Sequence, residues 1–222
     1  MSSDQTEVLT AAGIAPERWG RQRLRTLSDG ERQLYRWILR SFRSGAPLRR
    51  SALADAASAL DLEAEPALAT LSREDLVHHD SETGAVLVAY PFSGRPTAHQ
   101  VRFEDGGEAF AMCAIDALGI APMLGEPIEI TSRDPLTDEE IRVAHEPEGR
   151  AGWQPYDAVV VCGATGKGES CSSCCPVLNF FASRDSATRW LASHPEVRGS
   201  VMTLADAIVA ARTVFGDILE EG

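Results

Sequence analysis

The stretch Glu31-Arg-Gln-Leu-Tyr-Arg-Trp-Ile-Leu-Arg-Ser-Phe-Arg-Ser44 sets the architecture of the first part of the chain. Its apolar side chains recur three and four residues apart, which is the spacing of one helix face. These apolar positions are Leu34, Trp37, Ile38 and Phe42. Gly45 and Pro47 then end the predicted helix.

Two more helices and a hairpin follow this first helix in the predicted order. We expect helices over Ala52–Leu60, with Ser51 as its N-cap, and over about Glu63–Leu71. Short strand-like runs lie at Leu76-Val77 and Ala85–Tyr90. Three helices followed by a β-hairpin is the order of a winged helix-turn-helix domain, which we assign to residues 31–92. Residues 1–30 show weak periodicity and are expected to be partly mobile.

Beyond residues 91–96, which read as a linker, the pattern changes to a mixed α/β domain over residues 97–222. Strands are predicted at residues 100–103, 128–132, 140–144 and 157–162, and helices at residues 109–118, 186–194 and 204–219. Residues 179–182 fit either the start of a helix or the end of a strand. The predicted fold class is therefore α+β, with a small antiparallel sheet in the second domain.

Composition and charge exclude several classes of protein. The 222 residues are 44% hydrophobic and 24% charged, which is ordinary for a globular protein. No apolar run reaches the ~18 residues of a membrane span, and the first twenty residues lack a signal-peptide pattern, so we expect a cytoplasmic protein that binds no membrane. The net charge of −12 argues against nucleic-acid binding, although arginines are concentrated in the first fifty residues.

The five cysteines point to metal or thiol chemistry. They are Cys113, Cys162, Cys171, Cys174 and Cys175. Four of them fall within fourteen residues, and thiolates are ligands for soft metals. A four-cysteine zinc site made of this group is an alternative, but its compressed spacing is unlike the usual two separated pairs.

A second constellation is Cys113-Ala-Ile-Asp116. If this stretch is helical, its thiol and carboxylate share one face. The alternative without a functional role is a buried cysteine beside a surface aspartate, because free cysteine is among the most buried residue types.

Two other features are judged to carry no chemistry. The loop Gly163-Ala-Thr-Gly-Lys-Gly-Glu-Ser170 has the wrong spacing for a phosphate-binding loop, so nucleotide binding is rejected. The five histidines show no ligand spacing and are expected at surface or turn positions. They are His78, His79, His99, His145 and His194.

At this point the sequence resembles the organomercurial (alkylmercury) lyases. The segment Phe110-Ala-Met-Cys-Ala-Ile-Asp-Ala-Leu118 is similar to the family's helix with its Cys-Ala-x-Asp core. The segment Cys174-Cys-Pro-Val-Leu-Asn-Phe-Phe-Ala-Ser183 is similar to its second cysteine stretch. The resemblance covers about residues 31–215, and the two segments are specific only together.

The resemblance implies an enzyme that cleaves carbon–mercury bonds by protonolysis, giving a hydrocarbon and Hg(II). Carried over by position, the catalytic residues are Cys113, Asp116 as proton carrier, and Cys175, with Cys174 as the fallback. The thiolates of Cys113, Cys175 and Cys174 are the implied mercury ligands, with Cys171 as an additional candidate. No cofactor is implied. Excess small thiol would release Hg(II) to cellular thiols or to a mercuric reductase.

Two departures from the family pattern and three alternative functions stay open. The family pattern has no counterpart of Cys162 or Cys171, and its further cysteine would lie near Arg133-Asp134, where this chain has none. A metal-handling protein without turnover is one alternative, and a relative that cleaves another carbon–heteroatom bond is a second. A cysteine-based transcription regulator is a third, which the net charge disfavours.

Overall fold

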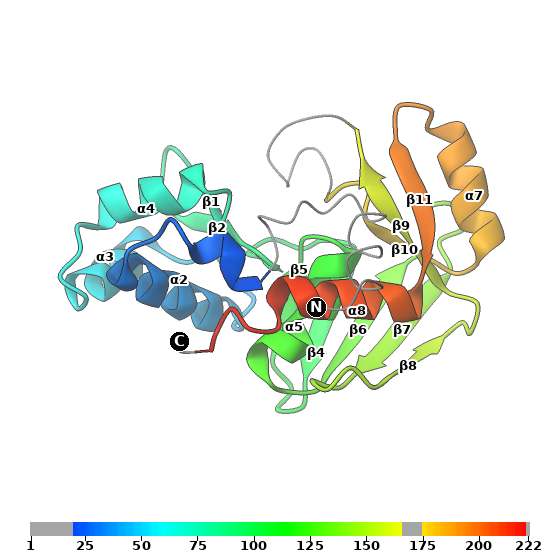
Figure 1. Cartoon of the computed structure of the whole chain (residues 1–222), viewed down its shortest axis with the longest axis horizontal. Helices are drawn as coiled ribbons and strands as arrows, with labels where there is room; N and C mark the ends of the chain where they lie inside the picture. The colour runs from blue at the N-terminus through cyan, green and yellow to red at the C-terminus, as the bar shows by residue number, and fades with distance from the viewer. Residues whose placement is uncertain (1–19, 166–174, 221–222) are drawn as a thin grey trace.

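Three helices and two short strands follow one another in the N-terminal part, in the predicted order (Figure 1). The computed structural model describes residues 20–165 and 175–220. Its first elements are the 3-10 turn η2 (Gly20–Leu24), helices α2 (Asp29–Phe42), α3 (Arg50–Ser58) and α4 (Ala64–Arg73), and strands β1 (Val77–His79) and β2 (Val86–Ala89). The turn η2 was not predicted, and residues 1–19 of the predicted mobile segment lie outside the described part. That this unit is a winged helix stays a prediction.

The helix starts differ from the predicted ones for local reasons. Helix α2 begins at Asp29 because Ser28 and Glu31 form a reciprocal capping box. The prediction of Ser51 as an N-cap is wrong: α3 begins one residue before it, with Arg49 in the cap position and no side-chain cap. The backbone of Leu48 is hydrogen-bonded to that of Val86, so the chain turns into α3 directly after this bridge.

An eight-stranded antiparallel sheet runs from the N-terminal hairpin into the second part of the chain. Its order is β1-β2-β3-β5-β4-β6-β7-β8. The added strands are β3 (Phe92–Ser93), β4 (His99–Phe103), β5 (Glu108–Ala111), β6 (Ile128–Arg133), β7 (Glu140–His145) and β8 (Ala151–Gln154). The linker prediction for residues 91–96 is wrong at residues 92–93, because Phe92 is fully buried and pairs with Ala89 on one side and Ala111 on the other. The division of the chain into domains at residues 31–92 and 97–222 remains a proposal. In that division, the eight-stranded sheet is shared by the two domains.

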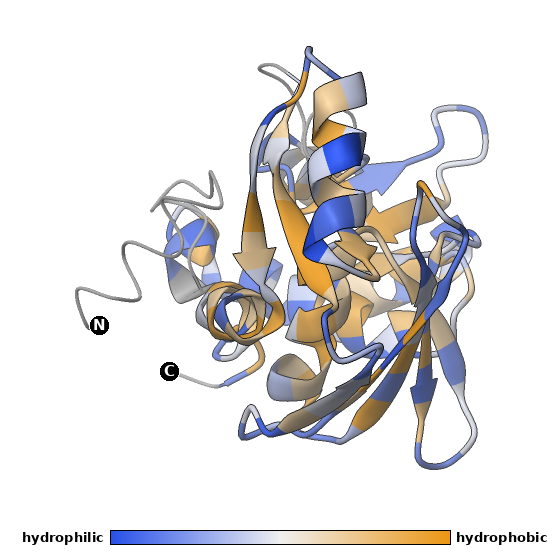
Figure 2. Cartoon of the chain, turned by 90° about the vertical axis from the view of Figure 1, so that its right-hand side faces the viewer, coloured by the Kyte–Doolittle hydropathy of each residue, from blue (hydrophilic) through white to orange (hydrophobic). Residues whose placement is uncertain are grey.

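A second, three-stranded antiparallel sheet has the order β10-β9-β11. Its strands are β9 (Val159–Ala164), β10 (Asn179–Phe181) and β11 (Arg198–Thr203), and helix α7 (Arg184–Ser193) packs against them. Figure 2 shows the strands of this sheet as mainly apolar and α7 with hydrophilic residues on its outer side. The open assignment of residues 179–182 is thus settled as strand. Strands β8 and β11 were not predicted. No residue of the short strand β8 is fully buried, and most residues of β11 are exposed.

Helices α5 (Ala114–Leu124) and α8 (Leu204–Phe215) pack closely against each other (Figure 1). Gly119 lies under the Phe215 ring, where a β-carbon would overlap that ring. The prediction of one helix over residues 109–118 is wrong in its first half, since residues 108–111 form β5 with alternate side chains buried. The helix itself is buried on nearly every face, so it carries little helical periodicity.

No helix within the described ranges has the length and apolarity needed to cross a lipid bilayer.

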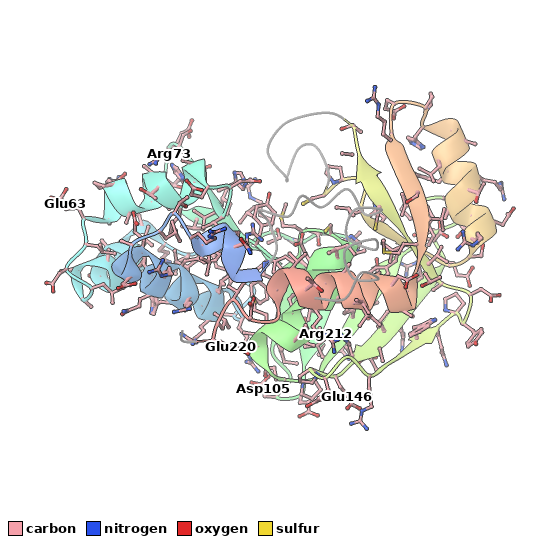
Figure 3. The ribbon with its side chains drawn as sticks, viewed as in Figure 1. Glu63, Arg73, Asp105, Glu146, Arg212 and Glu220 are labelled. Atoms are coloured by element: carbon pink, nitrogen blue, oxygen red, sulfur yellow. The ribbon has the colours of Figure 1, made fainter. Side chains whose placement is uncertain are left out.

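The N-terminal helices are expected to act as a scaffold and not to read DNA. Helix α4 extends two residues beyond its predicted end and therefore includes Arg73, but Glu63 and Glu65 stand at its start, where phosphates would approach (Figure 3). Arg50 is paired with Glu65 at 2.5 Å. A gel-shift titration with duplex DNA should show no tight, salt-dependent binding. Binding that weakens when Arg49 and Arg50 are changed to alanine would contradict this expectation.

One detail of the scaffold prediction is wrong. Leu62, Leu68 and Leu71 were expected to pack against the second part of the chain, but Leu62 lies beside Gly30 at the start of α2. Leu68 and Leu71 are in α4. Both are buried, but the main contacts of α4 are with α2, α3 and β1, so these leucines form the core of the N-terminal part itself.

Candidate active site

Cys113 is the N-cap of α5 and not a residue within the helix. It follows β5, and its backbone is extended (φ −156°, ψ 179°). Its Sγ accepts a hydrogen bond from the backbone N–H of Asp116 at 3.4 Å. An N-cap and the residue three positions later meet through such a bond. The predicted proximity of thiol and carboxylate is therefore confirmed, although it arises from capping and not from a shared helix face.

Asp116 completes this arrangement with its side chain. The thiol of Cys113 donates a hydrogen bond to Asp116 Oδ2 at 2.9 Å, and the thiol of Cys175 lies 3.7 Å from the same oxygen. One carboxylate oxygen thus faces two thiols that are 62 positions apart in the sequence. The potential ligand atoms of the three residues all lie within 4.8 Å of one another.

Cys175 is placed by the chain that follows it. Asn179 Nδ2 donates to the Pro176 carbonyl at 2.8 Å and closes the turn after the cysteine. The backbone N–H of Ala114 donates to the Leu178 carbonyl at 2.8 Å, which ties this turn to the start of α5 beside Cys113. The two cysteine segments are thereby joined through the main chain as well as through the site.

Burial changes the proton affinity of the site. Cys113 is 2% exposed, and Asp116 and Cys175 are 5% exposed. Burial raises the pKa of the Cys113 thiol to about 12, so the thiol is protonated at neutral pH. Burial also raises the pKa of Asp116 to about 7, against the opposing effects of its bond from Cys113 and the positive charge of Arg23. A carboxyl group with this pKa can both accept and donate a proton near neutrality.

Of the other three cysteines, only Cys162 lies among the described residues, and it does not join this cluster. Cys162 is fully buried in the centre of β9 and belongs to no group of three potential ligands there. Cys171 and Cys174 lie outside the described residues, so the fallback thiol and the additional ligand remain predictions. The alternative four-cysteine zinc site also depends on these two residues.

The histidine prediction is wrong for two of the five. His99 and His145 are 2% and 1% exposed and lie in strands β4 and β7. Burial lowers the pKa of each to about 4, so both are neutral. His99 Nδ1 is 3.0 Å from Ser132 Oγ. Both lie on the buried face of a strand, which a count of ligand spacings could not detect.

Sequence reasoning missed two charged residues, one that acts on Asp116 and one that contacts the chain beyond Cys175. Arg23 of η2 lies with its guanidinium 5.8 Å from the centroids of both the Tyr90 and Phe215 rings, and its charge favours the ionised form of Asp116. Asp134 follows β6 and accepts a hydrogen bond from the backbone of Ala182, just beyond β10. Both residues make contacts with residues far away in the sequence, so no local sequence pattern predicts these contacts.

The sequence of this chain matches a known protein family. The family model described as alkylmercury lyase matches residues 92–216, a range that contains the whole three-residue cluster and more than half of the chain. This chain belongs to the alkylmercury lyase family.

Curated relatives support this assignment over most of the length. An alkylmercury lyase of Staphylococcus epidermidis is 31% identical over 191 residues, which are 85% of this chain and 84% of the relative. An alkylmercury lyase of Streptomyces lividans is 27% identical over 187 residues, covering 84% of this chain and 83% of the relative. The alignments therefore extend beyond the two cysteine segments and include much of the N-terminal part.

A solved structure shares the fold. The crystal structure of the mercury-bound form of MerB2 superposes with a TM-score of 0.74 and covers 97% of this chain and 100% of that one, at 22% identity. The mixed α+β architecture is thus that of an alkylmercury lyase throughout the chain.

Proposed function

We propose that this protein cleaves the carbon–mercury bond of organomercurials by protonolysis, with Cys113 and Cys175 as mercury-binding thiolates and Asp116 as proton carrier. The observation that carries the proposal is the convergence of two thiols on one oxygen of a buried carboxyl group. Family membership supplies the reaction class, and this geometry supports the role proposed for each residue.

The first step is capture of the organomercurial R–Hg–X, where X is a small thiolate. Because the Cys113 thiol is protonated in the free enzyme, it must lose its proton as the sulfur binds mercury. Asp116 Oδ2, 2.9 Å from the sulfur, is placed to take that proton. A sulfur–mercury bond then forms, and Asp116 passes the proton to X, which leaves as HX. Asp116 is thereby ionised again, and the mercury atom stays bonded to R and to Cys113.

The second step breaks the carbon–mercury bond. The Cys175 thiol, whose sulfur lies 3.7 Å from Asp116 Oδ2, passes its proton to that oxygen and its thiolate adds to mercury. The protonated Asp116 then gives the proton to the carbon atom, whose bonding electron pair forms the new C–H bond. The products are R–H and Hg(II) held by two thiolates, and Asp116 is left ionised. Burial favours this delivery because it raises the proton affinity of the carboxyl group.

Product release requires other thiols under this proposal. Two thiolates hold soft Hg(II) strongly, so release by hydrolysis would be slow. Excess small thiol would displace the protein sulfurs one at a time and return a proton to each. Cellular thiols or a mercuric reductase would then receive the metal, and a cytoplasmic location would suit both acceptors.

Two further functions remain as alternatives to be separated from the lyase. A thiolate metal-binding protein would use the same cluster without turnover. A relative acting on another carbon–heteroatom bond would keep the proton carrier but not require a soft electrophile.

One assay separates all three. The purified chain is incubated with methylmercury or phenylmercury and excess thiol, and release of methane or benzene is followed by gas chromatography. We expect catalytic release in many-fold excess over enzyme. Stoichiometric mercury binding without hydrocarbon release would indicate the metal-binding protein. The absence of both mercury binding and hydrocarbon release would indicate a relative that acts on another carbon–heteroatom bond.

A further inference from the structure

The anchoring of strand β10, which follows Cys175, is not explained by the chemistry described so far. This strand is at the edge of its sheet and pairs only with β9 within it. Just before β10, the Leu178 carbonyl accepts from Ala114 N at 2.8 Å. Just after β10, the Ala182 N–H donates to Asp134 Oδ2 at 2.9 Å. A backbone group at each end of the strand is thus bonded to a segment outside its own sheet.

Asp134 is itself held rigidly in the turn between β6 and β7. Its Oδ1 accepts from the backbone N–H groups of Leu136 and Thr137 at 2.8 and 3.1 Å. Its own N–H donates to the Glu139 carbonyl at 2.9 Å. Asp134 is 1% exposed. Burial would raise the pKa of its carboxyl group, but the hydrogen bonds that the group accepts, three of them from backbone N–H groups, lower this pKa, so the buried group is ionised.

The strand between the two anchors is stiff. Phe180 is fully buried, and its ring packs edge-on against the neutral His99 of β4, with ring centroids 5.7 Å apart. Strand β10 also packs beside β6, the strand that leads into Asp134. At the other end, the Asn179–Pro176 bond closes the turn that carries Cys175. A shift at Ala182 would therefore be transmitted along the strand to the cysteine.

We propose that Asp134 is a positioning residue for Cys175, because its carboxylate fixes the far end of the strand whose near end holds this thiol beside Cys113. The inference rests on the function proposed above. Asp134 touches no reacting atom. It acts by holding one sulfur at the spacing from the other that a single mercury atom requires, and interactions of this kind around a metal site commonly change affinity or activity by 10- to 100-fold.

The test uses the full chain with Asp134→Asn. The amide oxygen can still accept from Leu136 and Thr137, so the turn is kept, but the amide NH2 group then meets the Ala182 N–H and cannot accept from it. Asp134→Ser is the second variant, since a serine hydroxyl can also close such a turn but is too short to reach Ala182. The matched control is Asp138→Asn, which removes an exposed carboxylate from the same hairpin.

We expect both Asp134 variants to lower kcat for phenylmercury by about 10- to 100-fold with little change in KM. The affinity for Hg(II), measured by competition with a monothiol, should fall by a similar factor, because one thiolate no longer stays in reach of the metal. Asp138→Asn should behave as wild type in both measurements. Thermal unfolding sets an assay temperature at which every variant is folded.

The inference is overturned if the Asp134 variants keep kcat and Hg(II) affinity within about twofold of wild type, or if Asp138→Asn causes an equal loss. Failure of the proposed function looks different, since the wild-type chain itself would then release no hydrocarbon. In that case the Hg(II) competition alone decides on Asp134, because it measures the spacing of the two thiols without any turnover.

Discussion

Changing Cys113 to serine should abolish hydrocarbon release, with a loss on the order of 10³-fold or more. The hydroxyl oxygen is a poor ligand for a soft metal, so it can neither capture the organomercurial nor hold Hg(II) together with Cys175. Gas chromatography of benzene released from phenylmercury measures the loss, and Hg(II) titration should show that two-thiolate binding is lost with it.

Two cysteine variants serve as controls for that experiment. Cys162→Ala removes a thiol that is buried in β9 and belongs to no described ligand cluster, so activity should be kept. Cys171→Ser should also leave most of the turnover, because this residue has no counterpart in the family pattern. If Cys171→Ser caused loss of bound zinc and of folding while Cys113→Ser remained active, the four-cysteine zinc site would be the better interpretation.

Changing Asp116 to asparagine should lower kcat by about 10²- to 10⁴-fold while Hg(II) binding is retained. The amide has nearly the same shape, but it cannot take the thiol proton and deliver it to carbon. Both thiols stay in place, so the variant should bind mercury without releasing benzene at an appreciable rate. Comparing benzene release with Hg(II) stoichiometry on the same sample separates proton transfer from metal capture.

The chain provides a matched control for Asp116 at the start of α8. There Thr203 caps the helix, and Asp206 stands three residues later with its N–H and carboxylate bonded to the threonine hydroxyl. This is the geometry of Cys113 and Asp116, but it is exposed and contains no thiol. Asp206→Asn should therefore keep full activity. A comparable loss in both variants would mean that helix capping, and not proton transfer, explains the effect.

Much of the secondary structure could be predicted because it depends on local periodicity. Helix α2 shows a regular apolar face, and strands β6 and β7 alternate inward and outward residues. Predictions failed where tertiary contacts decide the conformation. Phe92 lies in a segment rich in proline and glycine, yet its burial between β2 and β5 makes that segment a strand. Helix α5 has no polar face because the protein surrounds it.

The residues of the candidate site also differ in whether a local pattern or a tertiary contact reveals them. Cys113 and Asp116 stand in a short motif that pairs a thiol with a carboxylate, and the resemblance to the alkylmercury lyases picked out Cys175 among the neighbouring cysteines. Asp134 looked like an ordinary turn residue, because the donor from Ala182 is 48 positions away in the sequence. Contacts of this length are set by how the two sheets meet, which no local pattern encodes.

The use of a thiol as a helix cap has a consequence for how this activity can be lost during evolution. Where a side chain caps one of the other described helices, it is a hydroxyl residue: Ser28 before α2, Ser183 before α7 and Thr203 before α8. Serine is a preferred N-cap and cysteine is not among the preferred residues, so selection for folding alone would favour serine at position 113. A lineage no longer exposed to organomercurials could accept that single-atom change without harm to the fold. It would leave descendants that are folded, abundant and inactive, which the identity of this one residue would reveal.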